Sequence, residues 1–158
     1  MDKNKIIFLL LILTIVVIVT VSGQEKQGYI KPTASIGFSS YRSDIFNYNL
    51  ATLALDVDFI NIWGLTFGLQ SVIAWSDKEI LPLNNFGLGY TYSTNRFSIG
   101  GKIIAIPITI SGGIGFNING NYWFNKYIGL TGLFDSGFSL GTLGWEYYSI
   151  RIGVSTKI

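Results

Sequence analysis

The closing stretch of the chain, Gly144–Ile158, alternates between apolar and polar side chains. From Tyr148 to Ile158 every second residue is apolar or nearly so, and the residues between them are small or charged. Successive side chains of a β-strand point to opposite faces, so this period of two predicts a strand with one apolar and one polar face. We expect the apolar face to meet lipid and the last residue to belong to the architecture.

The same alternation recurs along the preceding sequence and predicts eight strands in total. The strand at Phe97–Ile106 departs from the pattern, because Ile103–Ile106 is apolar on both faces. The predicted strands are Tyr29–Tyr41, Leu50–Ile60, Leu65–Ser76, Asn85–Tyr92, Phe97–Ile106, Ile114–Phe124, Tyr127–Phe134 and the closing stretch.

The predicted connections alternate between long and short. The second, fourth and sixth are tight turns, and the four long ones are Arg42–Asn49, Asp77–Asn84, Pro107–Gly113 and Asp135–Thr142. This rhythm is typical of a membrane barrel with short periplasmic turns and longer outer loops. An even strand number places both ends on the periplasmic side. The predicted fold class is therefore all-β, an eight-stranded antiparallel up-and-down transmembrane β-barrel.

Composition predicts which face of each strand meets lipid. Charged residues make up only 13% of the chain and hydrophobic ones 49%, and the polar faces consist mainly of Gly, Ser, Thr and Asn. A soluble barrel turns its apolar faces inward and needs Lys and Glu outside. We therefore expect the apolar faces outside and the small polar ones inside, where the interior of an eight-stranded barrel is just wide enough for side chains.

Aromatic residues near the strand ends fit the two interfacial girdles of such a barrel. On the long-loop rim the expected girdle is Phe38, Tyr41, Trp75, Phe86, Phe134 and Trp145, and on the other rim it is Phe59, Trp63, Tyr92, Phe97 and Tyr122.

The N-terminal segment has the layout of a secretory signal peptide. A short basic start, Met1–Lys5, precedes the apolar run Ile6–Val21, and small residues follow up to Gly23. The competing interpretation is an uncleaved anchor, but sixteen helical residues reach only about 24 Å of a hydrocarbon core of about 30 Å. The expected organisation is a cleaved signal peptide over residues 1–23 and a barrel over residues 24–158, exported to the outer membrane.

Two stretches carry a resemblance to a known group. Asn121–Leu130 resembles the strand–turn–strand unit of the small outer-membrane barrels of the OmpA/OmpX type, and Arg151–Ile158 is similar to their C-terminal assembly signal, with Thr156 and Ile158 in place of the usual pair and no terminal Phe. The resemblance implies the same eight-stranded fold in outer-membrane lipid. It also implies recognition of the closing strand by the barrel-assembly machinery.

A few charges lie on the polar faces, where a narrow lumen would bury them. A lone buried charge costs several kcal/mol, so these residues must pair. We expect a structural ion network of Lys31, Asp56, Asp58, Lys102 and Arg151, with Gln70. The alternative, an acid/base pair of two carboxylates about 7 Å apart, lacks a cleft in a filled barrel. Asp77, Glu79 and Asp135 are expected to be solvated loop residues.

The chain has no His and no Cys, which removes the usual zinc sites and the commonest general base. Membrane-barrel lipases, acyltransferases and proteases of similar architecture rely on His. We therefore expect no enzyme activity, no cofactor and no metal. A formal charge of +2 with scattered Lys and Arg gives no sign of nucleic-acid binding.

The leading functional expectation is a structural or surface-interaction barrel with four extracellular loops, through which any extracellular ligand would bind. One alternative is a narrow ion channel. Another is a soluble lipocalin-like binder of a hydrophobic ligand, which the doubly apolar strand at Phe97–Ile106 favours.

Overall fold

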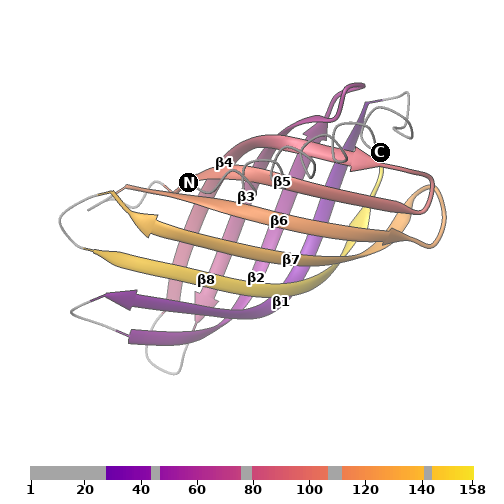
Figure 1. Ribbon diagram of the computed structural model, residues 1–158. Coiled ribbons are helices and arrows are strands. Elements are labelled where there is room, and N and C mark those ends of the chain that lie inside the picture. The colour runs from indigo at the N-terminus through magenta and orange to yellow at the C-terminus, as the bar shows by residue number, and fades with distance from the viewer. Residues whose placement is uncertain (1–27, 44–46, 76–79, 107–111, 141–143) are drawn as a thin grey trace, which may run out of the picture.

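The computed structural model describes residues 28–43, 47–75, 80–106, 112–140 and 144–158. The described residues form a closed barrel in which each strand pairs antiparallel with its neighbours in sequence and β8 closes on β1 (Figure 1). The strands are β1 Tyr29–Ser43, β2 Asn47–Ile60, β3 Leu65–Trp75, β4 Ile80–Ser93, β5 Phe97–Ile106, β6 Gly113–Trp123, β7 Ile128–Ser139 and β8 Trp145–Thr156. Within the described ranges no helix is long and apolar enough to cross a membrane. The predicted signal peptide lies outside the described residues.

One end of the barrel, here called the terminus rim, carries both the start of β1 and the end of β8. Ile30 and Ile158 exchange two backbone hydrogen bonds of 3.0 and 2.9 Å there. The side chains of Asn61 and Asn125 accept backbone hydrogen bonds in the β2–β3 and β6–β7 turns on this rim, and the Thr94 hydroxyl does so in the β4–β5 turn. Asn61 accepts from the amides of Trp63 and Leu65, both at 2.9 Å, and Gly64 takes the positive φ of 81°.

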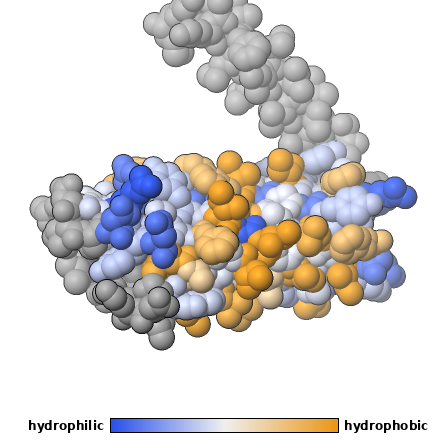
Figure 2. All heavy atoms as spheres, turned by 90° about the horizontal axis from the view of Figure 1, so that it is seen from below, coloured by the Kyte–Doolittle hydropathy of each residue, from blue (hydrophilic) through white to orange (hydrophobic). Residues whose placement is uncertain are grey.

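The wall of the barrel has the predicted polarity. Along β3, outward positions from Leu65 to Trp75 are exposed while the positions between them are buried. Phe38 and Ile150 are 78% and 69% exposed, and apolar residues form a band across the wall in Figure 2. The outward apolar face is therefore confirmed. The lipocalin-like interpretation is wrong, because it needs these side chains to line the interior.

The strands extend further toward the loop rim, the end opposite the terminus rim, than the sequence predicts. Three expected loops contain strand residues and are therefore too long as predicted: Arg42–Asn49, Asp77–Asn84 and Asp135–Thr142. The ladder of β1 and β2, for example, continues to Arg42 opposite Asn47. The outward residues of β1 and β2 there are polar, as Arg42, Asn47 and Asn49 show, so the apolar period that marks these strands lower down is lost.

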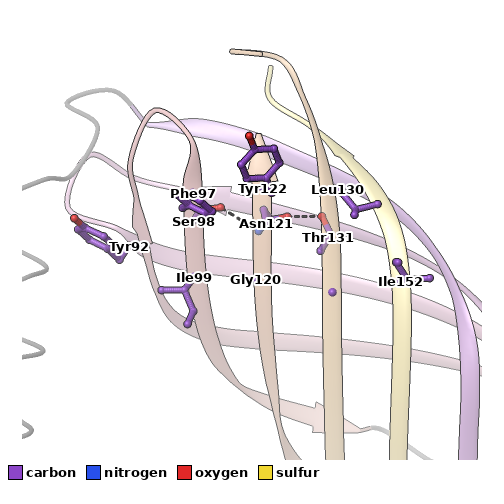
Figure 3. A pocket seen from close by; sticks show the side chains of 11 residues that line it. Tyr92, Phe97, Ser98, Ile99, Gly120, Asn121, Tyr122, Leu130, Thr131 and Ile152 are labelled. Atoms are coloured by element: carbon purple, nitrogen blue, oxygen red, sulfur yellow. Dashed lines mark hydrogen bonds between the residues drawn. The ribbon is translucent and has the colours of Figure 1, made fainter. Parts of the chain in front are cut away.

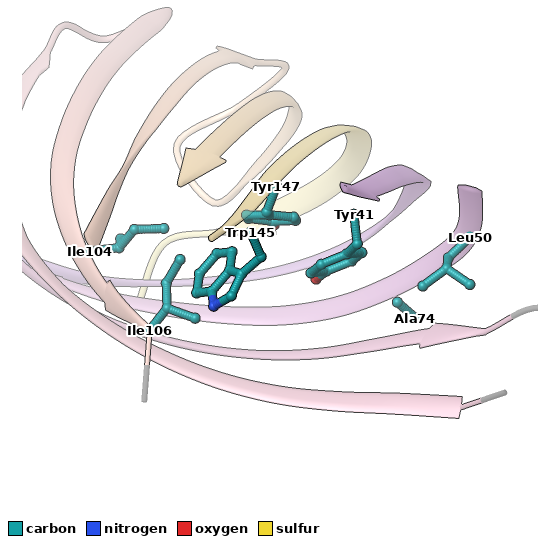
Figure 4. Packing of buried hydrophobic residues seen from close by; sticks show 7 residues of the cluster. All are labelled: Tyr41, Leu50, Ala74, Ile104, Ile106, Trp145 and Tyr147. Carbon is teal, nitrogen blue, oxygen red and sulfur yellow. The ribbon is translucent and has the colours of Figure 1, made fainter. Parts of the chain in front are cut away.

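The inside of the barrel changes character at the loop rim. A buried apolar cluster fills it, here called the collar core: Tyr41, Leu50, Ala74, Ile104, Ile106, Trp145 and Tyr147 (Figure 4). The rings of Tyr41 and Tyr147 stack with centroids 4.8 Å apart. The girdle positions predicted for Tyr41 and Trp145 are wrong, since both point inward. The collar core also explains why β5 is apolar on both faces.

Candidate functional site

The lumen holds every charged residue that the sequence places on the polar faces. β1 contributes Lys31, β2 contributes Asp56 and Asp58, β5 contributes Lys102 and β8 contributes Arg151, and each is at most 5% exposed. These side chains point inward because successive residues of a strand face opposite sides, and their apolar neighbours face outward. The structure brings all five into ion pairs, in two clusters.

The first cluster centres on Asp58. One carboxylate oxygen lies 3.2 Å from the Lys31 ammonium and the other lies 2.5 Å from the Lys102 ammonium. Two cations thus share one carboxylate, and the cluster carries a formal charge of +1.

The second cluster centres on Arg151. Its guanidinium lies 3.0 Å from Asp56 and 2.5 Å from Asp135, and it also donates to the hydroxyl of Ser35 at 2.8 Å. Gln70 donates to the other oxygen of Asp56 at 2.8 Å. One cation shared by two carboxylates gives this cluster a formal charge of −1.

The prediction for Asp135 is wrong. The sequence predicts a solvated loop residue at this position, but Asp135 lies on the inward face of β7 and is 0% exposed. The signal that could have found it is charge balance, because three lumenal cations against two carboxylates leave one cation unpaired. With Asp135 the lumen holds three of each sign.

A chain of hydrogen bonds links the two clusters across β6. Lys31 donates to the Asn119 side chain at 2.8 Å, Asn119 donates to Asn117 at 3.0 Å, and Asn117 donates to Asp135 at 2.5 Å. Every donor points from the positive cluster toward the negative one. The amide dipoles therefore stabilise both net charges, and the two clusters form one electrically neutral network.

Hydroxyl and amide groups fill the lumen between this network and the terminus rim. Asn121 donates to Ser98 at 3.0 Å, and its carbonyl accepts from Thr131 and Ser155. Trp123 donates its ring N–H to the same Ser98 at 3.2 Å. On the other side, the Tyr147 hydroxyl donates to Asp135 at 3.3 Å and joins the network to the collar core.

The arrangement of these charges fits a stabilising ion network better than a pair of catalytic carboxylates. Asp56 and Asp58 belong to different clusters, and each is ion-paired with a buried cation. Both carboxylates are buried and engaged by cations, so neither faces a cleft that could admit a substrate. Removing one partner of a buried pair costs about 3–5 kcal/mol. The network thus ties β1, β2, β5, β7 and β8 together through the lumen.

Comparison with known proteins shows the class of fold. No protein-family model and no curated protein sequence matches the chain. The crystal structure of neisserial surface protein A (NspA) is similar with a TM-score of 0.58 at 12% identity, over 83% of this chain and 97% of that one. Ail, the attachment invasion locus protein of Yersinia pestis, gives 0.58 at 6% identity over 84% and 99%, and its complex with the heparin analogue sucrose octasulfate gives 0.55 at 7% over the same shares. The chain has the fold of the small eight-stranded outer-membrane barrels.

Proposed function

We propose that the protein is an outer-membrane barrel with a structural or surface-interaction role, exported by the signal peptide at residues 1–23 and assembled through its closing strand. The observation that carries this proposal is the inverted polarity of the barrel. Lys31 is 1% exposed and Asp135 is 0% exposed, while Phe38 is 78% exposed. An apolar band of this extent is typical of a surface that meets lipid or a partner. Strands of 10 to 15 residues are long enough to cross a bilayer, for which about 9–11 tilted residues suffice.

The filled lumen supports a structural role over an open channel. The charged residues inside the barrel pair with one another, and the collar core adds apolar side chains toward the loop rim. An ion crossing the lumen would have to separate these pairs and pass the collar core. We therefore expect no steady conductance.

A surface-interaction role places the binding groups at the loop rim, on a rigid barrel. NspA is named as a surface protein and Ail as an attachment protein. The charges of this chain near the four predicted loops are mixed and mostly acidic: Arg42, Asp44, Asp77, Lys78, Glu79 and Glu146. A polysulfated ligand such as the one in the Ail complex needs clustered cations, so we expect no binding of sucrose octasulfate here.

The test is membrane fractionation followed by a gel of boiled and unboiled samples. We expect the protein in the outer-membrane fraction, extracted only by detergent, with a band that shifts on boiling. A mature protein that stays in plain buffer would overturn the proposal. Planar-bilayer recording of the same preparation separates the two candidate roles, since a steady ionic current would support the channel.

A further inference from the structure

The outer wall has an apolar hollow close to the terminus rim. It has a volume of about 550 Å³ and is lined by residues of β4 to β8 (Figure 3). Its floor is formed by Gly120 and Gly132, which are cross-strand partners flanked by Ile99 and Ile152. A Cβ at either glycine would meet nothing within 4 Å, so the hollow exists because these two outward positions lack side chains.

A second hollow of about 410 Å³ lies beside the first, at the rim itself. Tyr122 borders both hollows, and the lining of the second includes Arg96 and Lys126. Both cations are exposed. The Lys126 ammonium lies 4.7 Å from the centre of the Tyr127 ring, and a hydrogen bond with Tyr127 raises the pKa of Lys126. The β4–β5 and β6–β7 turns contain no acidic residue, as their sequences Thr94–Arg96 and Phe124–Tyr127 show.

Another pair of hollows on the same barrel lacks this charge. A hollow of about 430 Å³ on the wall is bordered by Phe38 and Ile150, and a second of about 430 Å³ follows further along β1 and β8. The rim hollow of this pair includes both Arg42 and Glu146, which are cross-strand partners. The opposite charges of Arg42 and Glu146 cancel, whereas Arg96 and Lys126 give the other rim hollow two positive charges. An apolar hollow that adjoins a hollow lined by two exposed cations fits an amphiphile with an anionic head.

We propose that the two hollows at the terminus rim bind one anionic phospholipid, with an acyl chain over Gly120 and Gly132 and the phosphate at Arg96 and Lys126. This site rests on the proposed membrane location. The apolar volume lies within the range of about 300–1,000 Å³ that is usual for ligand sites. The Phe97 and Tyr122 rings, with centroids 5.2 Å apart, form a packed edge beside the chain. A second copy of the barrel would present an apolar wall to the groove, and at the terminus rim the described part of the chain has no exposed Asp or Glu to pair with the two cations.

The experiment is native mass spectrometry of the delipidated, folded protein in detergent, titrated with phosphatidylglycerol and, separately, with phosphatidylethanolamine. The wild type should retain one phosphatidylglycerol and bind phosphatidylethanolamine more weakly. Gly132→Leu and Gly120→Leu fill the groove and should each weaken binding by about tenfold or more, equivalent to 1.4 kcal/mol or more. Gly101→Leu is the matched control, because Gly101 also faces outward and its nearest neighbour is 3.9 Å away, yet it does not line the groove.

The charge variants test the head-group half of the site. Arg96→Gln with Lys126→Gln should abolish the preference for phosphatidylglycerol, while Arg42→Gln at the other rim should leave it intact. Unchanged binding in both leucine variants would overturn the proposal. So would a dimer of the wild type that the leucine variants dissociate, because the occupant would then be a second copy. A wild type that inserts into bilayers but retains no phosphatidylglycerol refutes this site alone, whereas failure to insert refutes the proposed function.

Discussion

The two ends of the barrel differ in the side chains that fill their interior, which are mainly polar toward the terminus rim and mainly apolar at the loop rim. In the lower part, from the ion network to the terminus rim, most inward side chains are polar and most outward ones are apolar. At the loop rim the inside is the apolar collar core. At the loop rim, the outer surface of β8, β1 and β2 is polar. The exposed residues there include Arg42, Asn47, Asn49 and Glu146. Trp75 and Phe138 remain outward aromatics elsewhere on the wall.

The proposed membrane location explains this difference. The proposed lipid surroundings require an apolar wall, and small barrels of this kind have a polar interior. Most buried side chains of the lower lumen are polar, although Ile60, Leu133 and Trp123 also point inward. Where the wall leaves lipid, the ordinary rule of soluble proteins returns, and apolar side chains can be buried in the interior. The position of the reversal therefore marks the edge of the proposed membrane band.

The largest expected effect comes from breaking the ion network in the lower lumen. Asp58→Ala leaves Lys31 and Lys102 without their shared carboxylate, and we expect it to lower the free energy of unfolding by about 3–5 kcal/mol. Glu146, an exposed acid at the loop rim, provides the control. Glu146→Ala should change the free energy of unfolding by at most about 0.5 kcal/mol. Urea titration of the barrel in lipid vesicles measures both. Equal effects would show that the lumenal pairs do not stabilise the barrel.

A smaller effect should separate the outer surfaces of the two parts. Ile150→Arg places a cation in the apolar band and should cost about 2–4 kcal/mol, whereas the same side chain near the interface should cost about 0–1 kcal/mol. Asn49→Arg, on the exposed face of β2 toward the loop rim, is the matched variant. Unfolding in vesicles again gives the difference. Similar costs at the two positions would remove the distinction between lipid-facing and water-facing wall.

The smallest expected effect compares two neighbours on β5. Ile104 is 2% exposed in the collar core, while Ile103 is 65% exposed on the wall. Ile104→Val should cost about 0.5–1.5 kcal/mol, because it leaves a cavity among fixed side chains. Ile103→Val should cost less, since lipid chains can move into the vacated space. A larger cost for Ile103→Val would contradict the proposed surroundings of one of the two residues.

The sequence predicted the wall because one rule governs every strand there. Lipid on one side and a narrow lumen on the other impose a period of two, which Phe86–Tyr92 and Tyr148–Ile158 show clearly. The rule fails near the loop rim, where polar residues such as Asn47 and Asn49 lie outward in strands. The alternation therefore predicts strand ends that are too early, and it places Asp135, Ser136 and Gly137 in a loop although they belong to β7.

The lumenal network was predictable in its members but not in its connections. Inward orientation follows from alternation, so the five predicted residues could be found from single strands. Which charges meet depends on distances across the lumen, as between Asp58 on β2 and Lys102 on β5. Strands that are not neighbours leave no pairing signal in the sequence, and for this reason the division into two clusters was missed.

The most direct test of the inverted polarity is a spin-label scan along β8 in lipid bilayers. The chain has no Cys, so single cysteines can be labelled at Ser149, Ile150, Ile152, Val154 and Ser155 without background. Labels at Ile150, Ile152 and Val154 should be accessible to oxygen dissolved in the lipid, while those at Ser149 and Ser155 should be shielded from it. Oxygen accessibility that peaks at Ser149 and Ser155, or that shows no alternation, would contradict the account.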